Sequence, residues 1–157
     1  MNRCSWCNLK NQKYVDYHDN EWCVLNMDER YLYEMFILES FQAGLSWECV
    51  LNKREAFLKA YDNFDIDKVV KYDDVKIEEL RNNKNIIRNR LKIQASINNS
   101  KIYMNIVNEF GSFYNYLSHF SGGRIFYEIG KTTSALSDKI SFDLRCRGMK
   151  FVGSTII

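Results

Sequence analysis

The chain has no proline in its 157 residues and only seven glycines. These two residues most often interrupt helices and strands, so their scarcity favours long helical segments. Runs that alternate apolar and polar side chains, the pattern of a half-buried strand, are hard to find. The sequence therefore predicts an all-α fold, and its length predicts a single domain over residues 1–157.

Capping residues and glycines place the expected helix boundaries. Asp28 and Gly44 bracket a helix over about 29–43, and Ser46 caps a second over about 47–61. Further helices are expected at 65–71, from Asp73 or Asp74 to about 83, at 88–109 before Gly111, at 112–120, and from Ser137 to Gly148. Residues 1–27 are expected to form an irregular arm rich in aromatic side chains.

Composition narrows the class of function only slightly. The net charge is +2, which neither demands nor excludes nucleic acid, so local charge clusters carry more information. The five cysteines are an odd number and no apolar leader precedes them, which argues against a disulfide framework and favours a cytoplasmic protein. No stretch approaches the length of a membrane span, so no membrane partner is expected.

Glu39 is a carboxylate where helical spacing calls for an apolar side chain. Positions 32, 35, 36, 39 and 43 share one helix face, which reads Leu, Met, Phe, Glu, Ala. A charge on such a face costs free energy to desolvate unless it is paired or used. Two interpretations follow: a carboxylate that, with nearby aromatic side chains, grips a flat, polar, partly cationic ring, or an ion pair with a nearby Arg or Lys at the edge of the face.

All three tryptophans, Trp6, Trp22 and Trp47, lie in the first third of the chain, with Tyr14 and Tyr17 among them. Aromatic rings stack on nucleic-acid bases, and a base turned out of a duplex needs stacking walls with polar groups at their edges. The alternative is that these rings form a plain aromatic core.

A basic cluster lies between Arg81 and Lys92. Its five cations, Arg81, Lys84, Arg88, Arg90 and Lys92, have no acid among them, and they flank the tight connection expected at 84–87. A turn followed by a helix N-terminus offers backbone N–H groups to a phosphate, and basic side chains would hold the same anion. The alternative is a solvated basic face.

Cys4 and Cys7 have the spacing of a zinc knuckle, and His18 and Cys23 follow them. A zinc site needs a second pair at matching spacing, which His18 and Cys23 would have to supply. The alternative is that these cysteines are small buried hydrophobic residues.

Several short segments of the sequence resemble a known family in both their residues and their order along the chain. They are Cys4-x-Trp6, Tyr17-His18-Asp19-Asn20-Glu21-Trp22, Leu38-Glu39, Gln42-Ala43-Gly44-Leu45-Ser46-Trp47, Lys53-Arg54-Glu55, Ile86-Ile87-Arg88-Asn89-Arg90-x-Lys92-Ile93 and Lys150-Phe151-Val152-Gly153. They resemble the bacterial 3-methyladenine DNA glycosylase I family, and they extend over the whole chain.

The resemblance implies an all-helical helix-hairpin-helix DNA glycosylase fold, with the hairpin at about 76–95. It implies a monofunctional, monomeric enzyme that flips 3-methyladenine out of alkylated double-stranded DNA and hydrolyses its N-glycosidic bond. Glu39 would be the catalytic and base-reading carboxylate, with Tyr17, Trp47, Trp6 and Trp22 around the base. Lys84, Arg88, Arg90 and Lys92 would contact DNA, and Cys4 with His18 would be half of a structural zinc site.

The chemistry of the lesion agrees with these roles. Adenine methylated at N3 is cationic and already a good leaving group, so the enzyme must mainly find the base, extrude it and hold the cation. Aromatic faces and a desolvated carboxylate both favour a cation over neutral adenine. Many related glycosylases place an Asp after the hairpin, but from 93 to 127 the only acid here is Glu109.

The sequence departs from the family pattern at several points. Asn85 and Leu91 replace glycines near the hairpin turn, where Asn tolerates a left-handed backbone and Leu would crowd DNA. Cys23 replaces a glycine at a position that we expect to need positive φ.

The family continues past Gly153 with a final helix and the other two zinc ligands. The apolar run 149–157 therefore suggests a chain that ends inside a structural element. Two ligands do not hold zinc tightly, so we expect zinc to be absent or weakly bound.

Two other functions remain open on the sequence alone. One is a non-catalytic DNA-binding module that keeps the hairpin without turnover. The other is a protein that binds the free 3-methyladenine base. Release of the base from alkylated duplex DNA separates both from a glycosylase.

Overall fold

The computed structural model describes residues 3–128 and 130–157, and every regular element in these residues is helical, as predicted. The longer helices are α1 (Gln12–Asn20), α2 (Glu29–Gln42), α6 (Asp74–Asn82), α7 (Arg90–Phe110), α8 (Phe113–Ser121) and α9 (Ala135–Cys146). The shorter ones are α3 (Trp47–Leu51), α4 (Arg54–Ala60), the 3-10 turn η1 (Asp62–Phe64) and α5 (Ile66–Val69).

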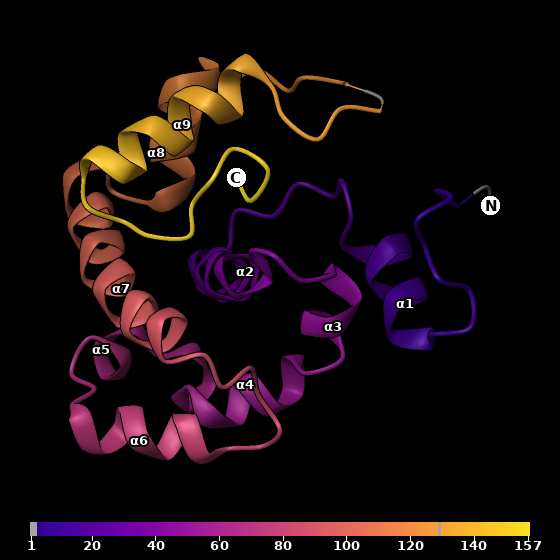
Figure 1. Cartoon of the computed structure of the whole chain (residues 1–157). Helices are drawn as coiled ribbons and strands as arrows, with labels where there is room; N and C mark the ends of the chain where they lie inside the picture. The colour runs from indigo at the N-terminus through magenta and orange to yellow at the C-terminus, as the bar shows by residue number, and fades with distance from the viewer. Residues whose placement is uncertain (1–2, 129) are drawn as a thin grey trace.

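Helix α2 crosses the middle of the molecule, with α7 on one side and α3 and α1 on the other (Figure 1). The main core is built around Ile37, Leu38 and Phe41 of α2, which pack with Ile93 and Tyr103 of α7. A second, smaller cluster joins Tyr14 and Tyr17 of α1 to Leu51 of α3. The aromatic arm is therefore packed against the body of the fold through side chains of its own.

Local capping explains most helix starts, and these predictions are confirmed. Asp28, Ser46, Asp65 and Asp73 each accept a hydrogen bond from a backbone N–H in the first turn of the helix that follows. Gly111 ends α7 in the left-handed conformation that glycine adopts without strain.

The arm is not irregular throughout, because residues 12–20 form α1. Asn11 makes no side-chain cap for this helix, and its amide instead donates to Glu48 at 2.8 Å and to Asn52 at 2.9 Å. Helix α1 is stabilised by burial of Tyr14, Val15 and Tyr17. A helix held by tertiary packing carries no local start signal.

The helix expected over 47–61 is broken into α3 and α4 at Asn52 and Lys53. The side chains at the break contact other segments: Asn52 accepts from Asn11, and Lys53 Nζ donates to the carbonyl of Asn85 at 3.2 Å. The helix is thus interrupted at the two residues whose side chains bind segments distant in sequence.

One further helix boundary and one turn differ from the prediction. Ser134, and not Ser137, caps α9, and Ser137 is its reciprocal partner in a capping box. Cys23 has φ 60°, as expected for a position that favours glycine, whereas Asn85 does not adopt positive φ. No helix in residues 3–128 and 130–157 combines the length and apolar character needed to cross a bilayer.

Candidate functional site

Glu39 lies in the last turn of α2 and forms no ion pair or hydrogen bond with any described residue. The alternative of an ordinary ion pair is therefore not what the structure shows. Burial raises the pKa of the Glu39 carboxyl from 4.5 to about 7, and no neighbouring cation offsets this rise. The protein holds a carboxyl group that would gain from a positively charged partner.

The Glu39 side chain lines a cavity of about 480 Å³. All five side chains expected to bind the base line this one cavity: Tyr17, Trp47, Trp6, Trp22 and Glu39. They come from α1, α2, α3 and the segments that flank α1. The five side chains therefore lie together in the structure, as expected, although the residues span 42 positions of sequence.

The rings of the cavity are arranged in two contacting groups. Tyr17 and Trp47 have ring centroids 5.3 Å apart, and Trp6 lies 5.2 Å from Trp22. Burial, reinforced by the nearby Glu39 carboxylate, raises the pKa of the Tyr17 hydroxyl, which therefore stays a neutral donor. The buried indole N–H of Trp47 has no acceptor among the described residues. Such a cavity can grip a flat, polar, cationic ring.

Several lining residues were not predicted as site residues. They are Tyr14, Gln42, Thr132, Thr155, Ile156 and Ile157. Tyr14 belongs to the aromatic arm and Gln42 follows Glu39 by three positions on the same helix, so helical spacing carries a signal for both. Thr132 and the 155–157 segment reach the cavity through long loops, for which the sequence offers no periodic signal.

Arg54 joins the C-terminal end of α1, within the aromatic arm, to α2. Its guanidinium donates to Glu34 of α2 at 2.6 Å and to Glu21, just after α1, at 2.8 Å. Glu21 immediately precedes Trp22, so this pair of ion pairs sets the position of one aromatic wall of the cavity. Partly buried charges joined in this way hold their elements in one arrangement.

The residues expected to hold zinc do not fit a metal as they stand. The structure brings Cys4 and His18 together, but His18 Nε2 accepts the backbone N–H of Cys4 at 3.1 Å, and Nδ1 lies 2.9 Å from Asp19. Both ring nitrogens are thus occupied, and Cys7 is buried with its thiol toward the carbonyl of Tyr14. Across residues 3–128 and 130–157, no cluster of three or more His, Cys, Asp or Glu side chains is placed to hold a metal ion.

The turn between α6 and α7 carries most of the basic cluster on the surface. Lys84, Arg88 and Arg90 are exposed, and none of them pairs with an acid in the described part of the chain. Arg81 differs because it pairs with Glu78 one turn earlier on α6, at 2.8 Å.

Lys92 does not belong to this exposed surface, contrary to its expected role as a DNA contact. Only 7% of the residue is exposed, and its ammonium donates to the carbonyls of Phe41 at 2.7 Å and Ala43 at 2.6 Å. The start of α7 turns Lys92 toward α2, while Arg88 and Arg90 face solvent.

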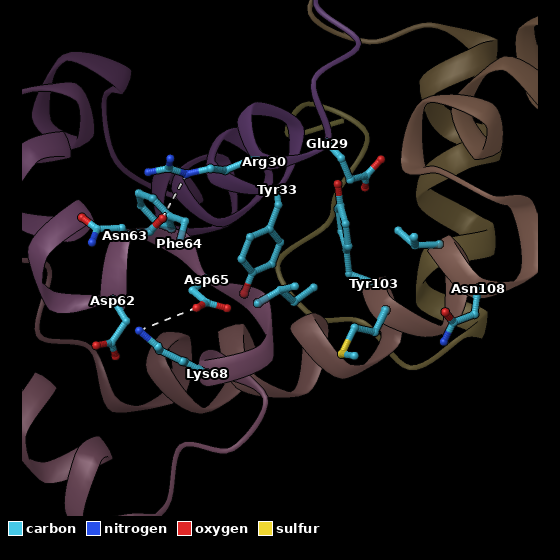
Figure 2. A pocket seen from close by; sticks show the side chains of 13 residues that line it. Glu29, Arg30, Tyr33, Asp62, Asn63, Phe64, Asp65, Lys68, Tyr103 and Asn108 are labelled. Atoms are coloured by element: carbon cyan, nitrogen blue, oxygen red, sulfur yellow. Dashed lines mark hydrogen bonds and ion pairs between the residues drawn. The ribbon is translucent and has the colours of Figure 1, made fainter.

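A larger cavity, of about 620 Å³, lies elsewhere, between α2, η1, α5 and α7 (Figure 2). It contains none of the predicted site residues. Lys68 lies 3.6 Å from Asp65, and Arg30 donates to the carbonyl of Asn63 at 3.2 Å. Tyr33 shares a 2.6 Å hydrogen bond with Ser100. Two pairs of lining residues therefore bind each other, whereas the Tyr103 hydroxyl and Glu29 Oε1 are buried without a hydrogen-bond partner among the described residues.

Comparison with known proteins places the chain in a family. The methyladenine glycosylase family model matches residues 6–157. DNA-3-methyladenine glycosylase 1 of Escherichia coli K12 is 41% identical, over 99% of this chain and 86% of that protein. The chain therefore belongs to the methyladenine glycosylase family.

Solved structures agree with this assignment. A crystal structure of 3-methyladenine DNA glycosylase I superposes with a TM-score of 0.93 at 37% identity, covering 99% of this chain and 88% of the other. A variant of such an enzyme in complex with 3-methyladenine superposes with a TM-score of 0.90 at 31% identity, covering 99% and 87%. The all-α fold expected from the resemblance is thus confirmed.

Proposed function

We propose that this protein is a monofunctional DNA glycosylase that hydrolyses the N-glycosidic bond of 3-methyladenine in alkylated DNA. The observation that carries the proposal is the grouping of four aromatic side chains around one unpaired carboxylate, Glu39, in a single cavity. Family membership supports the same reaction. We further propose that it acts as a monomer in the cytoplasm.

In this proposal the flipped base enters the cavity with its ring between aromatic walls. Tyr17 and Trp47 form one wall and Trp6 and Trp22 form the other. Glu39 faces the positive charge that methylation places on the base, and the base in turn restores the ionised form of Glu39. Normal adenine is neutral and gains little from either contact, so charge supplies the discrimination.

Glu39 acts mainly by complementarity to charge. The alkylated base leaves without strong protonation, and bond cleavage leaves positive charge on the sugar. A second acid beyond the hairpin is not part of the proposal, because Glu109 is bound to Arg147 at 2.6 Å.

Base release separates this function from its alternatives. Methylated duplex DNA is incubated with the protein, and free 3-methyladenine is measured by chromatography. The proposal expects free base and an intact strand with an abasic site. Salt-dependent duplex binding without release would identify a DNA-binding module, and binding of free base without duplex affinity would identify a base-binding protein.

We propose that α6, the 83–89 turn and the start of α7 form the helix-hairpin-helix DNA contact. The exposed cations Lys84, Arg88 and Arg90 would pair with phosphates beside the N-terminus of α7. Asn89 caps that helix, and no acid lies in its first turn.

Substitution of one of these cations tests the contact. Lys84→Ala or Arg88→Ala is expected to weaken binding to any duplex and to reduce the slope of log K against log salt by about 0.9. Fluorescence anisotropy over a salt series measures both quantities. Lys139→Ala, on exposed surface of α9, serves as the control; equal slopes for all variants would contradict the contact.

Zinc occupancy is a separate proposal. We expect no tightly bound zinc, since both ring nitrogens of His18 already have partners within the chain. Elemental analysis after dialysis against a weak chelator is expected to find well below one zinc per chain. One retained zinc per chain would refute this prediction.

A further inference from the structure

Lys92 is a buried cation that contacts neither the aromatic cavity nor solvent. It lies in the first turn of α7, two residues after Arg90, and its backbone N–H donates to the capping side chain of Asn89 at 3.1 Å. The ring of Phe151 lies 5.7 Å from the ammonium. Burial lowers the pKa of Lys92, so the fold bears a cost for keeping it there.

The ammonium of Lys92 caps α2 from outside that helix. The last carbonyls of a helix have no intrahelical partner, and cations are stabilising there. Helix α2 has no basic residue in its own last turn, and the chain leaves the helix at Ala43 with ψ 113°. Lys92 supplies donors to Phe41 and Ala43, at 2.7 Å and 2.6 Å.

The helix end held by Lys92 is the one that carries Glu39. Glu39 and Gln42 lie in the same last turn of α2, and both line the aromatic cavity. One side chain therefore joins the start of α7, directly after the basic turn, to the turn of α2 that bears the carboxylate.

We propose that Lys92 is a positioning residue that fixes the Glu39 end of α2 to the DNA-contacting start of α7. When a duplex binds at the basic turn, Lys92 keeps the cavity at a fixed position relative to that duplex. A base extruded from the duplex then reaches Glu39. This inference rests on the proposed glycosylase function. Lys92 acts through the backbone of α2, since its ammonium binds the carbonyls of Phe41 and Ala43 and does not line the cavity that holds Glu39.

The test compares base release with duplex affinity in Lys92→Met. This change keeps the length of the apolar stem and removes both hydrogen bonds to α2. With wild-type protein in excess over methylated duplex, the single-turnover rate of 3-methyladenine release is measured, and anisotropy gives the affinity for unmethylated duplex. We expect the rate to fall about 10- to 100-fold, as for a small misplacement of a reacting group, and the affinity to change less than twofold.

Two further variants make the result specific. Lys101→Met replaces an exposed lysine of the same helix and is expected to match wild type in both measurements. Lys92→Arg keeps a cation with donors at the end of α2 and is expected to recover part of the lost rate. Urea unfolding gives the folded fraction, so that rates are compared per folded molecule.

Three outcomes would overturn the inference: a wild-type rate in folded Lys92→Met, equal losses of rate and affinity, or no recovery in Lys92→Arg. If Lys92→Met does not fold, the rate and the affinity of Lys92→Arg are compared with those of wild type instead. A loss of rate larger than the loss of affinity then supports the inference. Equal losses there contradict it. Absence of release by wild type would instead contradict the proposed function itself.

Discussion

Glu39→Gln is expected to slow release of 3-methyladenine by about 100-fold or more, the loss typical when one preorganised electrostatic contact is removed. Glutamine keeps the shape of the side chain but lacks the negative charge that faces the cationic base. Single-turnover release from methylated duplex, with protein in excess, measures the effect free of product dissociation.

Glu109→Gln is the matched control for this loss. Glu109 lies at the surface and is bound to Arg147, away from the aromatic cavity. We expect it to release base at the wild-type rate. A Glu39→Gln variant that also keeps the wild-type rate would show that the carboxylate is not part of the reaction.

Glu39→Gln is also expected to stabilise the fold at high pH. The pKa of Glu39 is about 7 in the folded state against 4.5 ordinarily, so between these values the folded protein binds the extra proton. Stability therefore falls as pH rises through this window, by about 3 kcal/mol in total. Glutamine does not titrate, so the stability of Glu39→Gln relative to wild type should rise by about that amount between pH 4 and pH 8.

Urea unfolding of both proteins at pH 4 and pH 8 measures this difference, because every other titrating group is shared and cancels. A difference that stays constant with pH would mean that Glu39 is not desolvated in the folded protein. Lost activity together with gained stability is the pattern expected of a buried functional charge.

Local chemistry made much of the fold predictable from sequence. Asp28, Ser46, Asp65 and Asp73 are caps that act within one turn of their own position, so they can be read without tertiary structure. Helix α1 could not be predicted in this way, because the side-chain amide of Asn11 donates hydrogen bonds to Glu48 and Asn52, far along the chain, and does not cap the helix.

The candidate site was predictable where residue type and helical spacing coincide. Glu39 violates the apolar face of α2, and the three tryptophans concentrate near it in sequence; the cavity brings them together. Lys92 shows the limit of that reasoning. Its neighbours Arg88 and Arg90 are exposed, and composition alone cannot tell which basic side chain turns inward to bind the carbonyls of α2.

The central claim is that Glu39 and the aromatic walls recognise the positive charge of the alkylated base. The most direct measurement is the affinity of wild type and Glu39→Gln for two duplexes, one bearing 3-methyladenine and one bearing its neutral 3-deaza analogue. Both bases are carried on a 2′-fluoro sugar that slows cleavage. We expect wild type to prefer the cationic lesion by about tenfold or more, equivalent to about 1.4 kcal/mol, and Glu39→Gln to lose most of that preference and keep only the share that the aromatic walls supply. Equal binding of the two lesions by wild type, or an undiminished preference in Glu39→Gln, would contradict the claim.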